Sequence, residues 1–217
     1  MNEEQLEQIR DDVVEKMLPN VPFDGWSSRA LKEAASAAGI DHPTLRLAFP
    51  SGEIDAVVHY SNQLDKIFLE KIQKIDLSEM RIRERVTFAV RTRIEIIEDH
   101  REAARRAASM FSLPFYAPIG TQALYRTVDA IWHGIGDTST DFNFYTKRAI
   151  LAGVYASVLV IWFDDRSDGN TKTWEFLDRR IADVMQIEKV KAGLKSVTDR
   201  LPSPASFLGA LRYPARR

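Results

Sequence analysis

The sequence of 217 residues contains no cysteine and only four histidines. Without cysteine the chain can form no disulfide, no thiolate nucleophile and no cysteine-ligated metal site. Di-iron helical bundles place a glutamate three residues before a ligating histidine. Those positions hold Gly39, Ala56, Ile97 and Ala130. We therefore expect no metal and no cofactor.

Motifs of other enzyme classes are also missing. The zinc motif His-Glu-x-x-His does not occur, and Gly134-Ile-Gly136 is followed by Ser139 where a dinucleotide-binding loop requires a third glycine. The adjacent acids Asp164–Asp165 and Glu98–Asp99 could in principle form an acid–base pair. Adjacent acids at helix ends more often cap a helix or face solvent. We predict that the protein is not an enzyme.

The sequence also lacks a basic leader and a long uninterrupted apolar run. Residues 1–14 contain five acidic residues and one arginine, whereas signal peptides begin with basic residues. The longest apolar stretch, Ala149–Phe163, is interrupted by Gly153, Tyr155 and Ser157 and is shorter than the roughly 20 residues of a membrane span. We interpret this stretch as a buried core helix and expect a cytoplasmic protein.

What the sequence does contain is helical periodicity, with no stretch that alternates strictly enough for a strand. The pattern predicts an all-α fold. Helices are predicted at 3–17, from Ser27 or Ser28 to Gly39, and at 41–49, 53–75, 78–110, 121–133, 141–164 and 171–185. The two short helices around Gly39 have a helix-turn-helix shape. The expected domains are a helix-turn-helix-like unit (1–58), a larger helical body (59–185) and a C-terminal tail (186–217).

Charge is distributed unevenly along the chain. Residues 1–58 hold eleven acidic and five basic residues, whereas residues 186–217 hold two acidic and seven basic residues. The helix-turn-helix shape suggests one alternative function, a TetR-type, ligand-responsive DNA-binding regulator. A DNA reader needs several basic residues around its recognition helix. Residues 24–58 contain only three basic residues against five acidic ones, so we expect no nucleic-acid binding.

The tail combines basic residues with an apolar stripe. Val190, Leu194, Val197 and Leu201 recur at helical spacing among lysines, and a second apolar group follows Pro204. A terminal helix docked on the body and a helix lying on an anionic membrane surface both need such a stripe. The residues predicted to form a membrane-contacting tail are Lys191, Leu194, Lys195, Val197, Leu201, Phe207, Leu208 and Leu211.

Several long motifs resemble those of the ninth Coq (coenzyme Q biosynthesis) protein family. They are the segments 128–133, 136–148, 151–155 and 173–181. The resemblance implies a TetR-like fold that has lost DNA binding, a homodimer and a hydrophobic pocket for an isoprenoid lipid or quinone precursor. It further implies a non-catalytic protein on the inner face of a membrane, which assists the di-iron hydroxylase that acts on demethoxyubiquinone.

The resemblance also indicates where partners would bind. The hydroxylase-contacting patch of the family falls on Asp129, Ile131, Trp132, Phe144 and Tyr145, with Phe144 where the family commonly has tryptophan. Trp132 could equally belong to the core, because large aromatic residues are buried on average. The lipid-pocket candidates are the bulky apolar residues expected to point inward, some of which would be ordinary core: Phe111, Leu113, Phe115, Leu124, Tyr155, Leu159, Trp162, Phe163 and Phe176.

Overall fold

The computed structural model describes residues 1–137 and 142–198, and in this part of the chain the fold is entirely helical. The all-α prediction is therefore confirmed. The α-helices are α1 (Glu3–Met17), α2 (Val21–Asp24), α3 (Ser28–Ala37), α4 (His42–Ala48), α5 (Glu53–Ile72), α6 (Ile82–Glu95), α7 (Arg101–Phe111), α8 (Ala117–Gly134), α9 (Phe142–Asp164) and α10 (Thr171–Thr198). Two short 3-10 helices, η1 (Glu98–His100) and η2 (Asp168–Asn170), precede α7 and α10.

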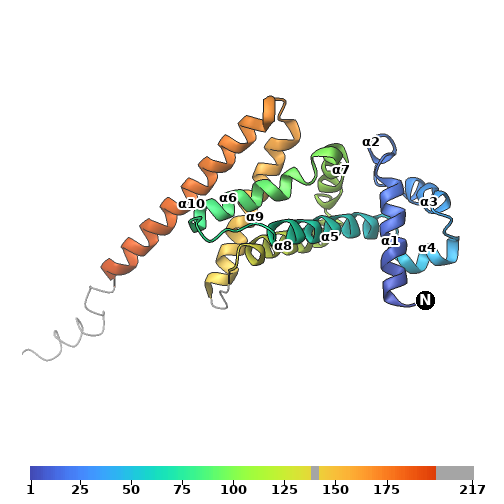
Figure 1. Ribbon diagram of the computed structural model, residues 1–217, viewed down its shortest axis with the longest axis horizontal. Coiled ribbons are helices and arrows are strands. Elements are labelled where there is room, and N and C mark those ends of the chain that lie inside the picture. Colours follow the sequence, from blue (N-terminus) through green and yellow to red (C-terminus); the bar gives the residue numbers. More distant parts are fainter. Residues whose placement is uncertain (138–141, 199–217) are drawn as a thin grey trace, which may run out of the picture. The chain divides into compact units, whose positions relative to one another are not determined.

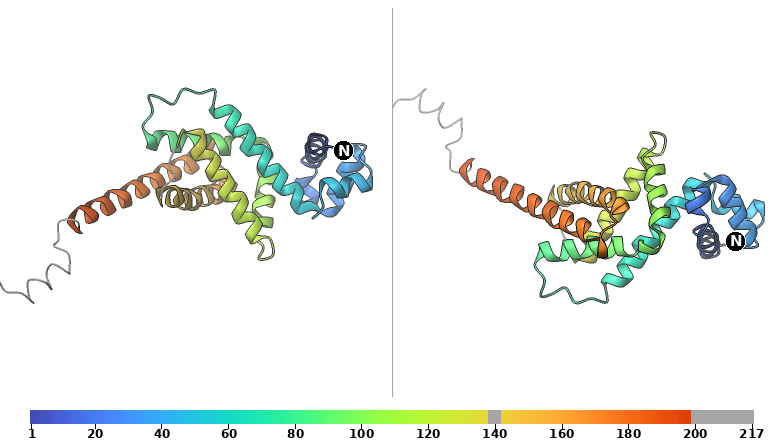
Figure 2. Two further views of the ribbon diagram at one scale, coloured as in Figure 1. Left: turned by 90° about the horizontal axis from the view of Figure 1, so that it is seen from below. Right: turned by 90° about the horizontal axis from the view of Figure 1, so that it is seen from above.

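The chain divides into two units, residues 1–177 and 178–217, and the division falls inside α10. In the first unit, α5 leads from the N-terminal helices into the group formed by α6 to α9 (Figures 1 and 2). The described part of the second unit is helical up to Thr198, and Arg180 and Asp183 form an ion pair of 2.8 Å within it.

Local sequence signals fix the ends of the N-terminal helices. The backbone N–H of Ala30 donates to the Ser27 hydroxyl at 3.2 Å, and the N–H of Thr44 donates to Asp41 at 2.8 Å. Both are helix N-caps, in which a side-chain oxygen satisfies a free backbone donor. Gly39 has φ of +71°, a left-handed conformation that glycine adopts without strain. The predicted helix-turn-helix shape therefore forms, with α3 and α4 on either side of Gly39.

Specific side chains join the N-terminal helices to the body. Nε2 of His59 in α5 lies 2.7 Å from Oδ1 of Asp11 in α1, and the Gln63 amide donates to the same oxygen at 2.5 Å. The indole N–H of Trp26 donates to the carbonyl of Ala103 in α7 at 3.0 Å. The boundary predicted after residue 58 lies within α5, and residues 1–177 form a single compact unit.

The single helix predicted for residues 78–110 is wrong, because the structure divides this segment into α6, η1 and α7. Helix α6 begins only after Arg81, whose backbone N–H donates to Glu84 at 2.8 Å. At the break, the Glu98 carboxylate accepts hydrogen bonds from Arg101 at 2.6 Å and from the Trp162 indole at 3.2 Å. Trp162 lies 64 residues from Glu98, beyond the reach of local helical periodicity, which explains why the pattern missed the break.

Helix α9 is a core helix on one face only. Val158 and Trp162 are fully buried, whereas Val160 and Ile161 are exposed. Residues 144–164 are long and apolar enough to cross a membrane, by length and composition alone. The expectation that this stretch is too short for a span is therefore wrong, because the helix extends beyond the apolar run on which that expectation was based.

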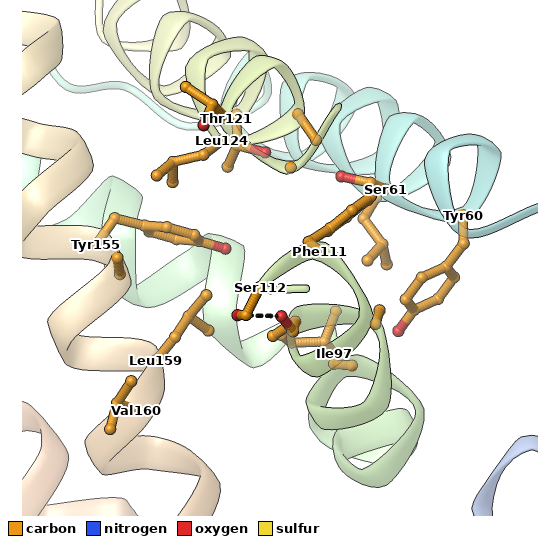
Figure 3. Close-up of a pocket in the computed structure, with 18 of the residues that line it drawn as sticks. Tyr60, Ser61, Ile97, Phe111, Ser112, Thr121, Leu124, Tyr155, Leu159 and Val160 are labelled. Carbon is orange, nitrogen blue, oxygen red and sulfur yellow. Dashed lines mark hydrogen bonds between the residues drawn. The ribbon is translucent and has the colours of Figure 1, made fainter. Parts of the chain in front are cut away.

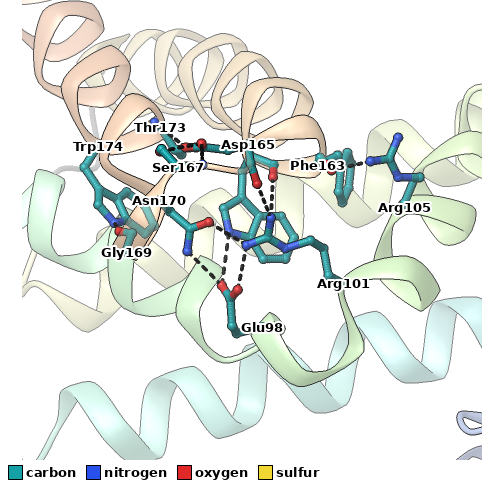
Figure 4. Close-up of polar contacts among 11 residues, drawn as sticks. Glu98, Arg101, Arg105, Phe163, Asp165, Ser167, Gly169, Asn170, Thr173 and Trp174 are labelled. Atoms are coloured by element: carbon teal, nitrogen blue, oxygen red, sulfur yellow. Dashed lines mark hydrogen bonds and ion pairs between the residues drawn. The ribbon is translucent and has the colours of Figure 1, made fainter.

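A polar network holds the joint between α9 and α10 (Figure 4). Asp165 accepts hydrogen bonds from the backbone N–H and hydroxyl groups of Ser167 and Thr173, at 2.5 to 2.8 Å. Arg101 donates to the backbone carbonyls of Trp162 and Asp165, at 3.1 and 2.8 Å. Asp165 therefore acts as a cap for the start of α10, as expected for an acid at a helix end.

The pKa of Asp165 is lowered, because its four hydrogen bonds outweigh the opposing effect of burial. A lowered pKa stabilises the fold above the unfolded value of about 3.9, and this contribution is lost as the pH falls through the folded-state pKa. We expect Asp165→Asn to reduce the free energy of unfolding by about 1.5–3 kcal/mol at pH 7, the range for hydrogen bonds to a charged group. The difference from wild type should shrink below pH 4. Urea unfolding at several pH values measures both effects.

The control is Asp164→Asn, which removes a neighbouring, exposed carboxylate paired with Arg105. This change should alter stability by less than about 0.5 kcal/mol, as is usual for surface sites. If the difference in the free energy of unfolding between wild type and Asp165→Asn grows as the pH falls below 4, the assigned role of Asp165 is contradicted.

Candidate functional site

A cavity of about 360 Å³ lies among α5, α6, α7, α8 and α9 (Figure 3). Five of the nine predicted lipid-pocket residues line it: Phe111, Leu124, Tyr155, Leu159 and Phe163. They come from α7, α8 and α9, so the fold brings together residues more than fifty positions apart in the sequence. The cavity is therefore the candidate functional site.

The other four predicted pocket residues do not line this cavity. Trp162 is fully buried elsewhere, with the Arg101 guanidinium 4.3 Å from its ring centroid, and Phe176 is half-buried in α10. Leu113 and Phe115 are 52% and 85% exposed. The expectation that these two residues point inward is wrong, because they lie in the turn around Pro114, outside the helices whose periodicity was used.

The space for the cavity comes from small side chains, whereas the sequence predicted only bulky apolar residues at this site. Ala104, Ala107 and Ala108 line it from α7, and Ala123 lines it from α8. A Cβ atom on Gly120 would lie 2.7 Å from Cβ of Phe111, so glycine permits the close approach of α7 and α8. The repeated alanines of α7 are the sequence signal that could have indicated this wall.

A buried ion pair forms the inner end of the cavity. Nε of Arg93 in α6 donates to Oδ1 of Asp65 in α5 at 2.8 Å. Thr127 in α8 donates to the two Asp65 oxygens, each at 3.0 Å. Arg93 and Thr127 line the cavity, and Asp65 lies behind them. Sequence reasoning missed this group, because its three members are brought together only by the packing of three helices.

Two tyrosines complete the inner end. Tyr60 and Tyr155 are both buried and line the cavity, and the Tyr155 hydroxyl points into it (Figure 3). Burial raises the pKa of both phenols, and the positive charge of Arg93 offsets only part of this effect. Both hydroxyl groups are therefore protonated at neutral pH and can donate hydrogen bonds.

The cavity also reaches the protein surface. Among the lining residues, Ser112, Thr121 and Val160 are exposed. The exposed side chains of Leu113 and Phe115 follow directly after Ser112 in the chain. The cavity therefore runs from a mouth beside the α7–α8 turn to a polar inner end.

The residues predicted to contact a hydroxylase cluster at the facing ends of α8 and α9. Asp129 pairs with the buried Arg148 at 2.6 Å, and the Arg148 guanidinium lies 3.3 Å from the ring centroid of the half-buried Phe144. Ile131 and Trp132 are buried. Tyr145 is 66% exposed, which makes it the most accessible of the five.

One further polar cluster lies where α1 meets α5. Ligand atoms of Glu7, Asp11 and His59 lie within 4.8 Å of one another, a spacing that could hold a cation. Asp11 already contacts His59 and Gln63, and Glu7 accepts from Arg10 at 3.2 Å. These contacts account for the cluster as a link between the two helices.

The ion pair at the inner end yields a stability prediction. Asp65→Ala leaves the buried charge of Arg93 without its partner, so we expect a loss of about 3–5 kcal/mol in the free energy of unfolding. Replacing both partners by apolar residues of similar volume, Asp65→Leu with Arg93→Met, should recover much of this loss, because no buried charge remains. Urea unfolding of the three proteins measures the difference. A double variant no more stable than Asp65→Ala would contradict this account.

Comparisons with known proteins find similar sequences. Residues 117–188 match the family model described as COQ9. The ubiquinone biosynthesis protein COQ9, mitochondrial, of Rattus norvegicus is 33% identical over 91% of this chain and 65% of its own length. The Homo sapiens protein of the same name is 30% identical over 91% of this chain and 64% of its own length. The chain thus spans about two thirds of the length of these relatives, slightly less in each case.

A solved structure with the same fold is the TetR transcriptional regulator from Nitrosomonas europaea ATCC 19718. The two chains superpose with a TM-score of 0.64 over 81% of this chain and 97% of the regulator, at 14% sequence identity. This likeness confirms the TetR-like fold and concerns the fold alone. The matches above confirm the resemblance inferred from the motifs: over most of its length the chain is similar to the COQ9 proteins, and residues 117–188 match the COQ9 family model.

Proposed function

We propose that the protein is a non-catalytic, lipid-binding accessory protein of ubiquinone biosynthesis. In this proposal the cavity holds an isoprenoid quinone precursor and presents it, at a membrane surface, to the di-iron demethoxyubiquinone hydroxylase. The observation that carries the proposal is the cavity, lined by apolar side chains, in a homologue of ubiquinone biosynthesis proteins. Ligand sites are typically concave and mostly apolar, with a few polar groups that fix orientation.

The size of the cavity sets what it could hold. Its volume of about 360 Å³ is near the lower end of the roughly 300–1,000 Å³ typical of ligand pockets. A space of this size suits the ring of a quinone precursor with the first part of its chain. The remainder of a long isoprenoid chain would leave through the mouth, where Val160, Leu113 and Phe115 expose apolar surface.

The same apolar turn supports contact with a membrane. Exposed aromatic and aliphatic side chains favour the interface of a bilayer. The basic tail would add electrostatic attraction to an anionic surface, at about 1 kcal/mol for each lysine or arginine. Of the tail residues predicted to contact the membrane, those from Lys191 to Val197 belong to α10, and Leu201, Phe207, Leu208 and Leu211 lie outside the described residues. Peripheral association with the inner face of a membrane stays a prediction.

Assembly into a homodimer is also part of the proposal. Val160 and Ile161 expose an apolar strip on α9, whereas Val158 and Trp162 on the same helix are fully buried. A symmetric dimer buries one patch against the same patch of a second copy. The strip on α9 is compatible with such a contact.

Lipid binding is tested by mass spectrometry of an organic extract from the protein purified out of quinone-producing cells. We expect isoprenoid or quinone species to be enriched relative to the membranes of those cells. The double variant Leu113→Ser/Phe115→Ser should stay folded but extract a quinone from vesicles more slowly, by a factor of at least about ten. Burial of each side chain in lipid contributes on the order of 1.5–3 kcal/mol, so its loss weakens contact with the vesicle.

A matched control changes two other exposed apolar residues, Phe23 in α2 and Leu47 in α4, to serine. Neither residue lines the cavity. This control should extract the quinone at the wild-type rate. Absence of enriched lipid in wild-type protein would count against lipid binding. Equal rates for the two double variants would count against the proposed path of lipid entry.

Hydroxylase contact is tested by separating surface residues from core residues. Tyr145→Ala should weaken capture of the hydroxylase while changing stability by less than about 0.5 kcal/mol, because the side chain is mostly exposed. Trp132→Ala should instead lower stability by about 3–5 kcal/mol, because the indole is only 8% exposed. Pull-down at equal protein concentration and thermal unfolding are measured for both. Wild-type capture by Tyr145→Ala would remove Tyr145 from the partner surface.

A further inference from the structure

The inner end of the cavity has hydrogen-bond donors that the described part of the protein does not use. The side chains of Tyr60 and Arg93 are each 3% exposed and line the cavity. The Tyr60 hydroxyl and Nη1 of Arg93 have no hydrogen-bond partner among the described residues. Buried polar groups without partners are uncommon and costly, so a site with two of them calls for an explanation.

The charge around these donors is already balanced. The Arg93 guanidinium is paired with Asp65 at 2.8 Å, and Thr127 donates to both Asp65 oxygens. A ligand with a negative head group would therefore add an uncompensated charge to a buried site, which is strongly unfavourable. A neutral oxygen acceptor could take the free hydrogen bonds without disturbing the balance of charge.

The position of the donors sets the orientation of the ligand. Tyr60 and Arg93 are at the buried end, whereas the exposed lining residues Ser112, Thr121 and Val160 mark the mouth. Apolar side chains, including Phe111 and Leu159, line the space between the two ends (Figure 3). An amphiphilic ligand that matches this pattern has its polar head at the inner end and its apolar chain toward the mouth.

We propose that the inner end of the cavity is a head-group site, in which Tyr60 Oη and Arg93 Nη1 donate hydrogen bonds to a neutral oxygen of a lipid that enters head first. Carbonyl, phenol and ether oxygens on a ring meet this requirement, and carboxylates and phosphates do not. This inference rests on the proposed lipid-binding function and deepens it, because it names the chemical group that the cavity selects. Burial also raises the pKa of Tyr60, so its hydroxyl keeps the proton it donates.

The test compares three ligands that share a ten-carbon chain: a decyl-substituted benzoquinone, decylbenzene and decanoate. Binding to delipidated wild-type protein is measured by isothermal titration calorimetry. We expect the benzoquinone to bind more tightly than decylbenzene, and decanoate to bind most weakly. Tyr60→Phe should weaken benzoquinone binding by about two- to tenfold, the range for one neutral hydrogen bond, and leave decylbenzene binding unchanged.

The matched control is Tyr125→Phe, which removes the hydroxyl of a 41% exposed tyrosine of α8 that does not line the cavity. It should bind all three ligands as wild type does. Tyr60→Phe keeps the ring that packs 5.2 Å from Trp26, centroid to centroid, so its fold should be retained, and thermal unfolding verifies this.

Three results would overturn the head-group site. If wild-type protein binds decylbenzene as tightly as the benzoquinone, the cavity binds apolar chains without reading a head group, and the proposed lipid-binding function stands. If decanoate binds most tightly, the cavity selects a charged head group, and lipid binding again stands. If none of the three ligands binds, lipid binding in this cavity fails together with the head-group site.

Discussion

The buried ion pair between Arg93 and Asp65 is the polar contact around which the helices of the body are arranged. It joins α6 to α5, and Thr127 brings α8 into the same group. A charged pair is expensive to bury, so its position is tightly constrained once the three helices pack. The surrounding helices must then fit around a fixed polar centre, and the small side chains of α7 leave an open space beside it. The same pair that orders the core thus forms the inner end of the cavity.

The parts of the fold that the sequence predicted are those set by local chemistry. Ser27 and Asp41 cap helices within three residues of themselves, so their role can be read from the sequence. The break after α6 depends on contacts of Glu98 with Trp162, 64 residues away, and periodicity carries no information about such pairs. The same limit applies to the cavity, where bulky residues were anticipated but the alanines that create the space were not.

The predicted partner residues show why a motif does not separate surface from core. Trp132 and Tyr145 belong to motifs of the same family resemblance, yet one is buried and the other is exposed. The buried Arg148 of α9 pairs with Asp129 of α8, so this ion pair also helps to hold α8 against α9. Phe144 lies against the same guanidinium from within α9. A motif shared with the family can therefore contain residues that hold the helices together as well as residues that form the surface. Only the arrangement of the helices distinguishes the two roles.

The N-terminal helices support elements that form the cavity, and this structural role is independent of DNA binding. Trp26 packs its ring against Tyr60 and donates its indole N–H to α7, so it contacts two elements that form the cavity. In α5, His59 contacts α1 while the next residue, Tyr60, lines the cavity. Removing α1 to α4 and the segment around Trp26 would deprive Tyr60 of its ring contact and His59 of its partner Asp11. The helix-turn-helix-like unit thus supports Tyr60 at the inner end of the cavity, a role that does not depend on its charge.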